Sequence, residues 1–386
     1  MGRLRPILIA MACAALAACQ AAGPGDVLAV QDAGNAARST PSVQSIGSGP
    51  IRIALILSRP ASEDPAVNVS DVRDGAALAL DDLGGGKFSL TVFEGADSAT
   101  QVEAQARAAQ AAGARLIVGP VGSDHGRAVA ALDAAQRPPV LALARNGAIA
   151  AAGVWTLYSD AVDSALEGAR AAIAARQTDF VIIHPRSQPA GDLARLQRGI
   201  AALSGKVLAL APYPDGAAAG VLEALLSHKP AFAVAQAAIV LGRTEAAGSV
   251  IDTLAAGRLG NAVATAIATT DLPQAMYARP SAQGLIVARP APMAAGVIDS
   301  RFAARFHRSP SRDAGIGYDT VAIAAALLGA GGDGAITAAA LQSPRGFRAL
   351  TGLFRFRADG SIERRHIVYR IENGSLQPLQ EEGAGF

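Results

Sequence analysis

Three consecutive residues, Ser123, Asp124 and His125, have the side-chain types of a serine hydrolase triad. In such a triad, a serine, a histidine and a carboxylate stand in a line so that each hydrogen-bonds to the next. Side chains of consecutive residues project in different directions and cannot form that line. The sequence also lacks the G-x-S-x-G turn that presents the serine in many hydrolases. We therefore expect no serine hydrolase chemistry.

Two glycine-rich segments partly resemble nucleotide-binding loops, but neither matches the full motif. The glycines within 329–334 have the G-x-G-x-x-G spacing of a dinucleotide fingerprint, but they follow a predicted helix instead of the required strand. Lys87 follows Gly84–Gly86, yet a phosphate-binding P-loop needs glycine where Asp81 stands and serine or threonine where Phe88 stands. We therefore expect no nucleotide cofactor.

Metal and nucleic-acid binding are not predicted either. No two histidines have a metal-ligand spacing; they are His125, His184, His228, His307 and His366. The 34 basic and 32 acidic residues give a net charge of +2, and the arginines are scattered instead of forming the basic stripe that nucleic acids need. We therefore expect no catalytic residues, no metal, no cofactor and no nucleic-acid partner, and we interpret the chain as a non-enzyme.

The two cysteines, Cys13 and Cys19, lie in an N-terminal segment with the features of a secretory signal. Arg3 and Arg5 precede a short apolar run over 7–16. A helix of that length spans about 15 Å, half of the ~30 Å hydrocarbon core of a membrane. The run therefore predicts a secretory signal and not a permanent transmembrane anchor.

Residues Leu16-Ala17-Ala18-Cys19 resemble the bacterial lipobox, the motif at which a signal is cleaved before a lipid-modified cysteine. The resemblance implies a signal peptide over 1–18 and a lipid on Cys19 that attaches the protein to a membrane facing the periplasm; an ordinary signal peptide is the alternative. Gln20 is not the aspartate that retains many lipoproteins at the inner membrane, which favours the outer membrane. Residues 19–50 lack an apolar period, and we interpret them as a flexible tether that reaches roughly 30 Å.

From Ile51 onward, short apolar runs alternate with Ala-rich helical stretches, and the 386-residue length suggests two domains. The expected strands are 51–58, 88–94, 116–119, 140–144, 180–184, 207–211, 232–241, 262–270 and 284–288, with a hairpin of 353–357 and 366–371. The expected helices are 69–83, 100–112, 126–136, 161–175, 191–203, 218–226, 244–256, 298–306 and 319–328. Such alternation indicates parallel sheets covered on both faces, so we predict an α/β fold with two doubly wound lobes.

Four motifs in order along the chain resemble type I periplasmic binding proteins. They are Arg115–Ser123, Pro139–Ala144, Gly317–Asp319 before a long helix, and Thr351–Phe356 with the turn at Asp359. Within that superfamily the sequence looks most like the leucine/isoleucine/valine-binding branch and the lipoproteins known as penicillin-binding-protein activators. The resemblance covers about residues 51 to 380 and implies two Rossmann-like lobes joined by three crossovers.

The family pattern also implies where the lobes divide. It places the crossovers near Tyr158, near Thr269–Met276, and between Leu341 and Gly352. Lobe 1 would then combine 51–157 with 280–342, and lobe 2 would combine 158–279 with 343–386.

A ligand site is expected where the strands of both lobes end, because helix N-termini there present unpaired N–H groups. These segments are 58–60, 122–126, 144–147, 158–160, 184–188, 242–244 and 269–272. In the amino-acid-binding relatives a serine and an Ala-x-Thr hold the ligand, and Ser123, Ala144 and Asn146 match these positions approximately. Arg145 departs from that pattern. The candidate ligand-binding residues are Ser123, Asp124, Ala144, Arg145, Asn146 and Tyr158, each of which could instead be an ordinary solvated loop side chain.

Two functions fit this resemblance. The first is a non-enzymatic envelope lipoprotein that binds a peptidoglycan synthase, as the penicillin-binding-protein activators do, although only a thirty-residue tether stands where the best-known activators have a helical-repeat domain. The second is a lipid-anchored receptor that closes its lobes on an amino acid or another small polar ligand and delivers it to an ABC permease.

Overall fold

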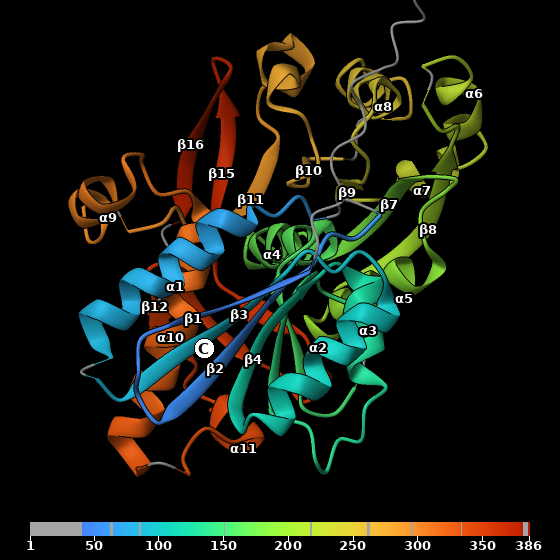
Figure 1. Ribbon diagram of the computed structural model, residues 1–386. Coiled ribbons are helices and arrows are strands. Elements are labelled where there is room, and N and C mark those ends of the chain that lie inside the picture. The colour runs from blue at the N-terminus through green and yellow to red at the C-terminus, as the bar shows by residue number, and fades with distance from the viewer. Residues whose placement is uncertain are drawn as a thin grey trace, which may run out of the picture. The chain divides into compact units, whose positions relative to one another are not determined.

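The computed structural model describes residues 41–61, 65–84, 86–149, 151–216, 218–260, 263–294, 296–332, 334–380 and 385–386. The predicted signal peptide, Cys19 and Gln20 lie outside these residues, as does most of the predicted tether. Pro41–Phe386 forms one unit that contains two mainly parallel sheets flanked by helices (Figure 1). The predicted α/β fold class is confirmed.

The first sheet holds six strands, in the spatial order β1 (Ser42–Ile46), β3 (Phe88–Glu94), β2 (Ile51–Leu57), β4 (Ala114–Val121), β5 (Val140–Arg145) and β6 (Val154–Tyr158). All of them run parallel except β1, which pairs antiparallel with β3. β1 lies inside the segment 19–50 that was predicted to be a tether, so that prediction is wrong from Ser42 onward. The strand was missed because four of its five side chains are exposed and it therefore carries no buried apolar pattern.

Both faces of the first sheet are covered, because alternate residues of each strand point to opposite sides. Ile53 and Leu55 of β2 join the core under α1 (Val69–Leu83) and α10 (Arg312–Gly331), with α9 (Asp299–Phe306) and α11 (Ala338–Leu341) nearby. Ala54 and Ile56 join a separate core under α2 (Ala99–Ala111) and α3 (Ser123–Ala130). The buried residues of β2 thus pack against helices on both faces of the sheet, as expected for a doubly wound sheet.

The second sheet holds seven strands, in the order β16 (Ser375–Gln380), β15 (His366–Glu372), β11 (Ile286–Pro290), β10 (Thr265–Ala268), β9 (Ala237–Val240), β7 (Asp179–Pro185) and β8 (Lys206–Tyr213). The strands from β11 to β8 run parallel. One face packs on α4 (Ala161–Ala174) and α5 (Ala190–Ala202), and the other on α6 (Val221–Leu226) and α8 (Glu245–Ala255). The strand predicted over 232–241 is shorter, because α7 (Lys229–Phe232) occupies its beginning; the remaining short helices are η1 (Gln274–Ala278) and η2 (Pro280–Ala282).

A small antiparallel sheet of β12 (Phe347–Ala349), β13 (Gly352–Phe356) and β14 (Ile362–Arg364) belongs with the first sheet. Phe354 and Phe356 pack in the same core as Trp155 of β6. The indole N–H of Trp155 donates a 2.8 Å hydrogen bond to the carbonyl of Arg357. These contacts hold the residues around β13 and β14 against the edge of the first sheet.

The chain therefore passes between the two sheets at Tyr158, after Pro290, and between Arg364 and His366. The second and third passages differ from the expected positions near 269–276 and 341–352. Residues 284–288 were placed with lobe 1, but β11 pairs in parallel with β10 of the second sheet. Residues 343–364 were placed with lobe 2, but their aromatic side chains pack in the core of the first sheet.

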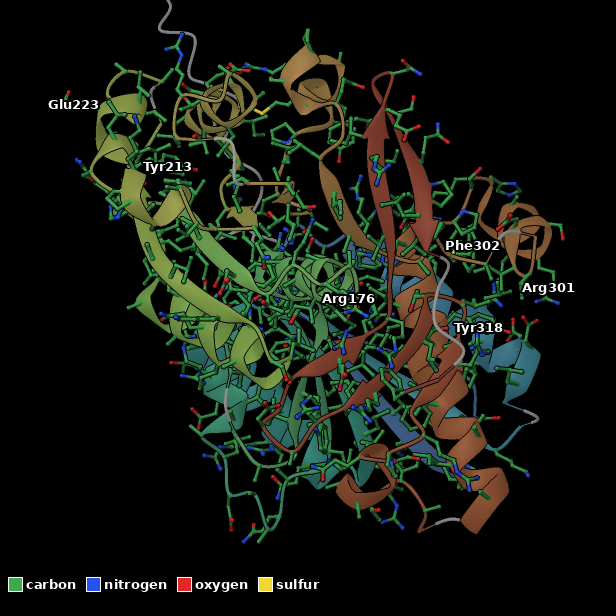
Figure 2. All side chains as sticks on the ribbon, turned by 180° about the vertical axis from the view of Figure 1, so that it is seen from behind. Arg176, Tyr213, Glu223, Arg301, Phe302 and Tyr318 are labelled. Atoms are coloured by element: carbon green, nitrogen blue, oxygen red, sulfur yellow. The ribbon has the colours of Figure 1, made fainter. Side chains whose placement is uncertain are left out.

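The motif Gly317–Asp319 holds α10 against its neighbours. Gly317 allows the backbone of α10 to approach Val72 on α1 so closely that a Cβ there would overlap the carbonyl of Val72. The Tyr318 hydroxyl donates to Asp82, which also pairs with Arg301 (Figure 2). The buried Asp319 carboxylate accepts from the backbone N–H groups of residues 350 and 351 and from the Thr351 hydroxyl. Among the described helices α10 alone is long and apolar enough to cross a membrane, but 61% of its apolar window is buried inside the protein.

We predict that Gly317→Ala lowers the free energy of unfolding by about 1 to 3 kcal/mol, because the added methyl forces α1 and α10 apart. Gly329→Ala on the same helix is the matched control, since a Cβ there meets no atom within 4 Å among the described residues. The control should be neutral or stabilising by about 0.5 to 1 kcal/mol. Urea unfolding of both variants checks this, and equal stabilities would contradict the packing described for α1 and α10.

Candidate functional site

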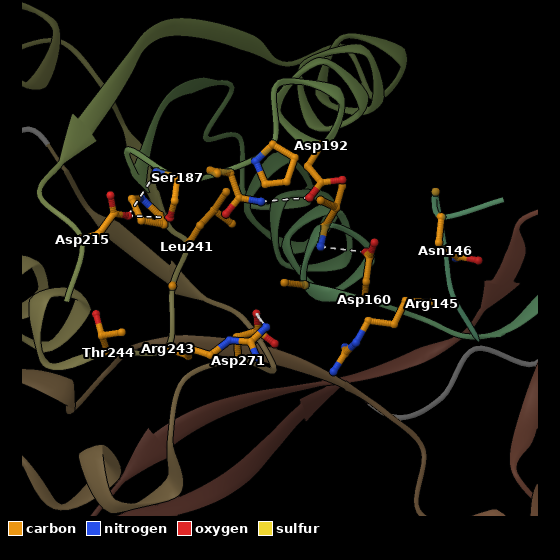
Figure 3. Close-up of a pocket in the computed structure, with 18 of the residues that line it drawn as sticks. Arg145, Asn146, Asp160, Ser187, Asp192, Asp215, Leu241, Arg243, Thr244 and Asp271 are labelled. Carbon is orange, nitrogen blue, oxygen red and sulfur yellow. Dashed lines mark hydrogen bonds and ion pairs between the residues drawn. The ribbon is translucent and has the colours of Figure 1, made fainter. Parts of the chain in front are cut away.

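The carboxyl ends of the strands of both sheets surround one cavity of about 590 Å³, which we call the cleft cavity (Figure 3). Six of the seven predicted segments contribute to its wall: 122–126, 144–147, 158–160, 184–188, 242–244 and 269–272. The seventh, 58–60, lines a separate hollow with Val67 and Asp313. Tyr213 at the end of β8, with Asp215 and Gly216 just after it, also lines the cleft cavity; this segment was missed, although it too stands at the carboxyl end of a parallel strand.

The six candidate residues fall into three groups. Ser123, Arg145 and Asn146 line the cleft cavity. Asp124 and Ala144 do not: the Asp124 side chain is exposed and pairs with Arg127 one turn along α3, and Ala144 is fully buried in the sheet. Tyr158 also lies outside the wall. Position at the carboxyl end of a strand thus predicted which loops line the cleft cavity, but not which of their side chains face it.

The side chain of Tyr158 makes a structural hydrogen bond instead of facing the cleft cavity. Its hydroxyl donates a 2.6 Å hydrogen bond to Asp313 near the start of α10. Burial, and then the adjacent Asp313 carboxylate, raise the pKa of Tyr158 well above its usual value. The residue therefore stays protonated and ties the end of β6 to α10.

Asn146 lines the cleft cavity, but its amide is fully bonded to the protein. The amide nitrogen donates to Asp163 on α4 at 2.8 Å and to the carbonyl of Ile362 at 2.7 Å. The amide oxygen accepts from the Thr156 hydroxyl at 2.6 Å and from the backbone N–H of Ile362 at 2.9 Å. Asn146 therefore joins the end of β5 to α4 and β14, and its role is to position these segments.

Asp163, the hydrogen-bond partner of Asn146 on α4, belongs to a buried cluster of charged side chains with Asp160 and Arg195. Burial, and then the nearby Asp160 carboxylate, raise the pKa of Asp163 above its usual value, while Arg195 and the donated hydrogen bonds oppose that rise. Arg195 on α5 pairs with both carboxylates. Asp160 also caps the N-terminus of α4 by accepting from the N–H groups of residues 162 and 163. The cluster orients the Asp160 carboxylate at the edge of the cleft cavity.

The wall contributed by β7, β8 and α5 presents two carboxylates in different environments. Asp215 accepts from the hydroxyl of Ser187 at 2.5 Å and from its backbone N–H at 3.1 Å, and these bonds lower the pKa of Asp215. Asp192 accepts from the Gln188 amide at 3.0 Å, and burial raises the pKa of Asp192. Figure 3 shows both carboxylates at the cavity.

The remaining charges of the wall are Arg145, Arg243 and Asp271, and Arg243 pairs with Asp271 at 3.3 Å. With Asp160, Asp192 and Asp215, the wall carries four carboxylates and two arginines. The N-termini of α3, α5 and α8 also begin at the cavity, and their N-cap residues Gly122, Pro189 and Thr244 make no side-chain cap hydrogen bond. The N-terminus of a helix favours an anionic group. The cavity can therefore hold a ligand that carries both a cationic and an anionic group.

No group of three or more potential metal ligands occurs among the residues that the structure describes.

Residues 50–375 match the family model described as periplasmic binding protein. The chain belongs to this family. Membership of a periplasmic binding protein family implies a periplasmic location. No curated protein sequence matches the chain.

Solved structures share the fold of this periplasmic binding protein at low sequence identity. One, assigned to a branched-chain amino acid ABC transporter of Rhodospirillum rubrum, has a TM-score of 0.65 and 18% identity and covers 85% of this chain and 99% of its own. A second is an ABC transporter substrate-binding protein from Desulfitobacterium hafniense in complex with Leu, with a TM-score of 0.55, 19% identity, and 85% and 99% coverage. A third is a solute-binding protein from R. palustris in complex with benzoate, with a TM-score of 0.52, 18% identity, and 86% and 96% coverage. They show the type I periplasmic binding protein fold.

We predict that Asn146→Leu lowers the free energy of unfolding by about 2 to 4 kcal/mol, because it leaves buried groups of Asp163, Thr156 and Ile362 without partners. Ser123→Ala, at the same cavity, is the control and should change stability by less than about 0.5 kcal/mol. Chemical unfolding measures both. If Asn146→Leu were as stable as Ser123→Ala, Asn146 would not have the positioning role assigned to it.

Proposed function

We propose that this protein is a solute-binding receptor that takes one small polar ligand in the cleft cavity and presents it to the permease of an ABC transporter. The observation that carries the proposal is the cleft cavity, whose wall comes from the carboxyl ends of strands of both sheets. Its volume of about 590 Å³ lies in the range of small-molecule sites. The three chain passages near Tyr158, Pro290 and Arg364 are the natural hinges for closure around a ligand.

The solved relatives support the same function, since two of them are described as a substrate-binding and a solute-binding protein of ABC transporters. One holds leucine and the other benzoate, so this fold accepts ligands of different chemistry. The alternative interpretation, an activator that binds a peptidoglycan synthase, has no comparable support. A non-enzymatic role agrees with a cavity wall whose polar groups suit binding.

The proposal makes a specific prediction for calorimetric titration of the purified full-length protein with amino acids and other small polar solutes. Leucine, isoleucine and valine should bind with dissociation constants of about 1 mM or weaker. Arg145 lines the cavity, and a guanidinium disfavours an α-ammonium placed beside it, so the prediction applies to amino acids whose ammonium would lie at Arg145. A loss of about 4 kcal/mol of affinity converts a micromolar binder to roughly millimolar.

Another solute of the panel should bind at least tenfold more tightly than leucine, isoleucine or valine does. The Asp192→Asn variant should bind that solute at least tenfold more weakly than the wild type does. Asp133→Asn, an exposed aspartate outside the cavity, is the matched control and should leave that binding unchanged. A micromolar dissociation constant for leucine would refute the repulsion assigned to Arg145. Equal affinities of the two aspartate variants would refute the cleft cavity as the binding site.

We further propose that a lipid on Cys19 attaches the receptor to the membrane, with the outer membrane favoured by Gln20. The lipobox-like residues 16–19 support this. Cys19→Ser should move the protein from the membrane fraction to the soluble periplasmic fraction, as measured by fractionation and immunoblotting, and Cys13→Ser is the control that should stay in the membrane. Mass spectrometry that finds an unmodified Cys19 in the wild type would contradict the anchor.

A further inference from the structure

A second pocket of about 440 Å³ lies at the third passage between the sheets, and we call it the hinge-side pocket. Its wall combines α4 and α5 of the second sheet layer with residues 357–366, which include β14 and the first residue of β15. Residues 357–360 are bonded to the first sheet, because the carbonyl of Gly360 accepts from the backbone N–H of Thr156 at 3.0 Å. The pocket therefore has one wall from each sheet layer. It shares no lining residue with the cleft cavity.

The net charge of the hinge-side pocket's wall is positive, whereas that of the cleft cavity's wall is negative. Its wall holds five arginines and four acidic residues, whereas the cleft wall holds two arginines and four acidic residues. The five arginines are Arg170, Arg195, Arg198, Arg357 and Arg364, and the four acidic residues are Asp163, Glu167, Asp359 and Glu363. A ligand of the hinge-side pocket is therefore expected to be an anion.

The four carboxylates already have partners. Glu167 pairs with Arg170 at 3.4 Å, and Glu363 pairs with Arg357 at 2.9 Å. Asp163 pairs with Arg195, and Asp359 accepts from the N–H and hydroxyl of Ser361. Arg198 has an exposed side chain and no ion pair with a carboxylate in the described part of the chain. The pocket thus offers a cation at Arg198 that no described carboxylate neutralises.

Two buried polar atoms of the wall also lack a partner among the described residues: Nε of Arg195 and Nε2 of His366. The guanidinium Nε carries a hydrogen and is a donor. The other nitrogen of His366, Nδ1, lies 2.9 Å from the carbonyl oxygen of Arg364, so it carries the proton of the neutral ring. Nε2 is consequently an acceptor, and burial lowers the pKa of His366 to about 3, which keeps the ring neutral. Orphaned buried groups of this kind call for a water, ion or ligand.

These observations define the chemistry of the missing partner. It must accept hydrogen bonds from arginines and donate one to the imidazole of His366. We propose that the hinge-side pocket binds a small oxyanion that also carries a hydroxyl, of the class of hydrogen phosphate. At neutral pH inorganic phosphate has both acceptor oxygens and at least one P–OH donor. Sulfate has the same shape and a similar charge but no hydrogen to donate.

The difference between phosphate and sulfate gives the test. The full-length protein in detergent is titrated calorimetrically with sodium phosphate and, separately, with sodium sulfate, at equal ionic strength and pH 7. Phosphate should bind one site per chain with a submillimolar dissociation constant, and sulfate should bind at least tenfold more weakly. Arg198→Ala should weaken phosphate binding at least fivefold, and its exposed position keeps the fold unaffected.

Two variants locate the site. Arg258→Ala, an exposed arginine that lines a different hollow beside α6 and α8, should leave phosphate binding unchanged. Arg145→Ala, in the cleft cavity, should also leave it unchanged. Loss of binding in Arg145→Ala but not in Arg198→Ala would place the anion in the cleft cavity and overturn the proposal. Equal affinity for sulfate and phosphate, or no binding of either, would overturn it as well.

Discussion

The buried amide of Asn146 is the contact on which the geometry of the cleft cavity depends. Its four hydrogen bonds join the end of β5 and Thr156 of β6 to α4 and β14. A buried amide with every group satisfied is expensive to move, because each broken bond leaves a polar group without water. The relative placement of the two sheet layers at this point therefore follows from one side chain. Arg145 directly precedes Asn146 at the end of β5, and Asp160 caps the helix α4 that carries Asp163, so both of these wall residues depend on the Asn146 contacts.

The ion pair between Arg195 and Asp160 connects the two pockets. Asp160 lines the cleft cavity, whereas Arg195 lines the hinge-side pocket. An oxyanion that drew Arg195 toward itself would leave the Asp160 carboxylate less neutralised and the cleft cavity more acidic. Coupling between two binding sites acts equally in both directions, so a cationic ligand in the cleft cavity would in turn favour the oxyanion. The pair is thus a physical link between the cleft cavity and the hinge-side pocket.

Much of the fold could be predicted because buried parallel strands and their helices have strong patterns. The bounds of α1 and β3 agree with the prediction to the residue, and six of seven predicted segments line the cleft cavity. Strands that carry little buried apolar surface, such as β1, could not be found this way. Membership of β11 in the second sheet was also missed, because an apolar run does not reveal which of two sheets it joins.

Individual side chains of the site were harder to predict than its loops. Ala144, Asp124 and Tyr158 follow strands at the right edge, but their directions depend on local geometry that strand position does not determine. Asn146 was identified as a ligand contact, whereas its partners Asp163 and Ile362 come from segments distant in sequence. Asp192 and Asp215 went unnoticed, since isolated aspartates in loops resemble ordinary solvated residues. The sequence thus located the loops that line the cleft cavity, and tertiary contacts decided which side chains face it.

The central claim is that the cleft cavity holds a small solute, and native mass spectrometry of freshly purified protein tests it most directly. The account predicts a species heavier than the polypeptide alone by one small polar molecule, which is released on unfolding and can then be identified by its mass. Replacing Asp192 by asparagine should reduce the fraction of this species. A wild-type protein that carries no bound molecule, and gains none when incubated with a periplasmic extract of its own cells, would contradict the claim.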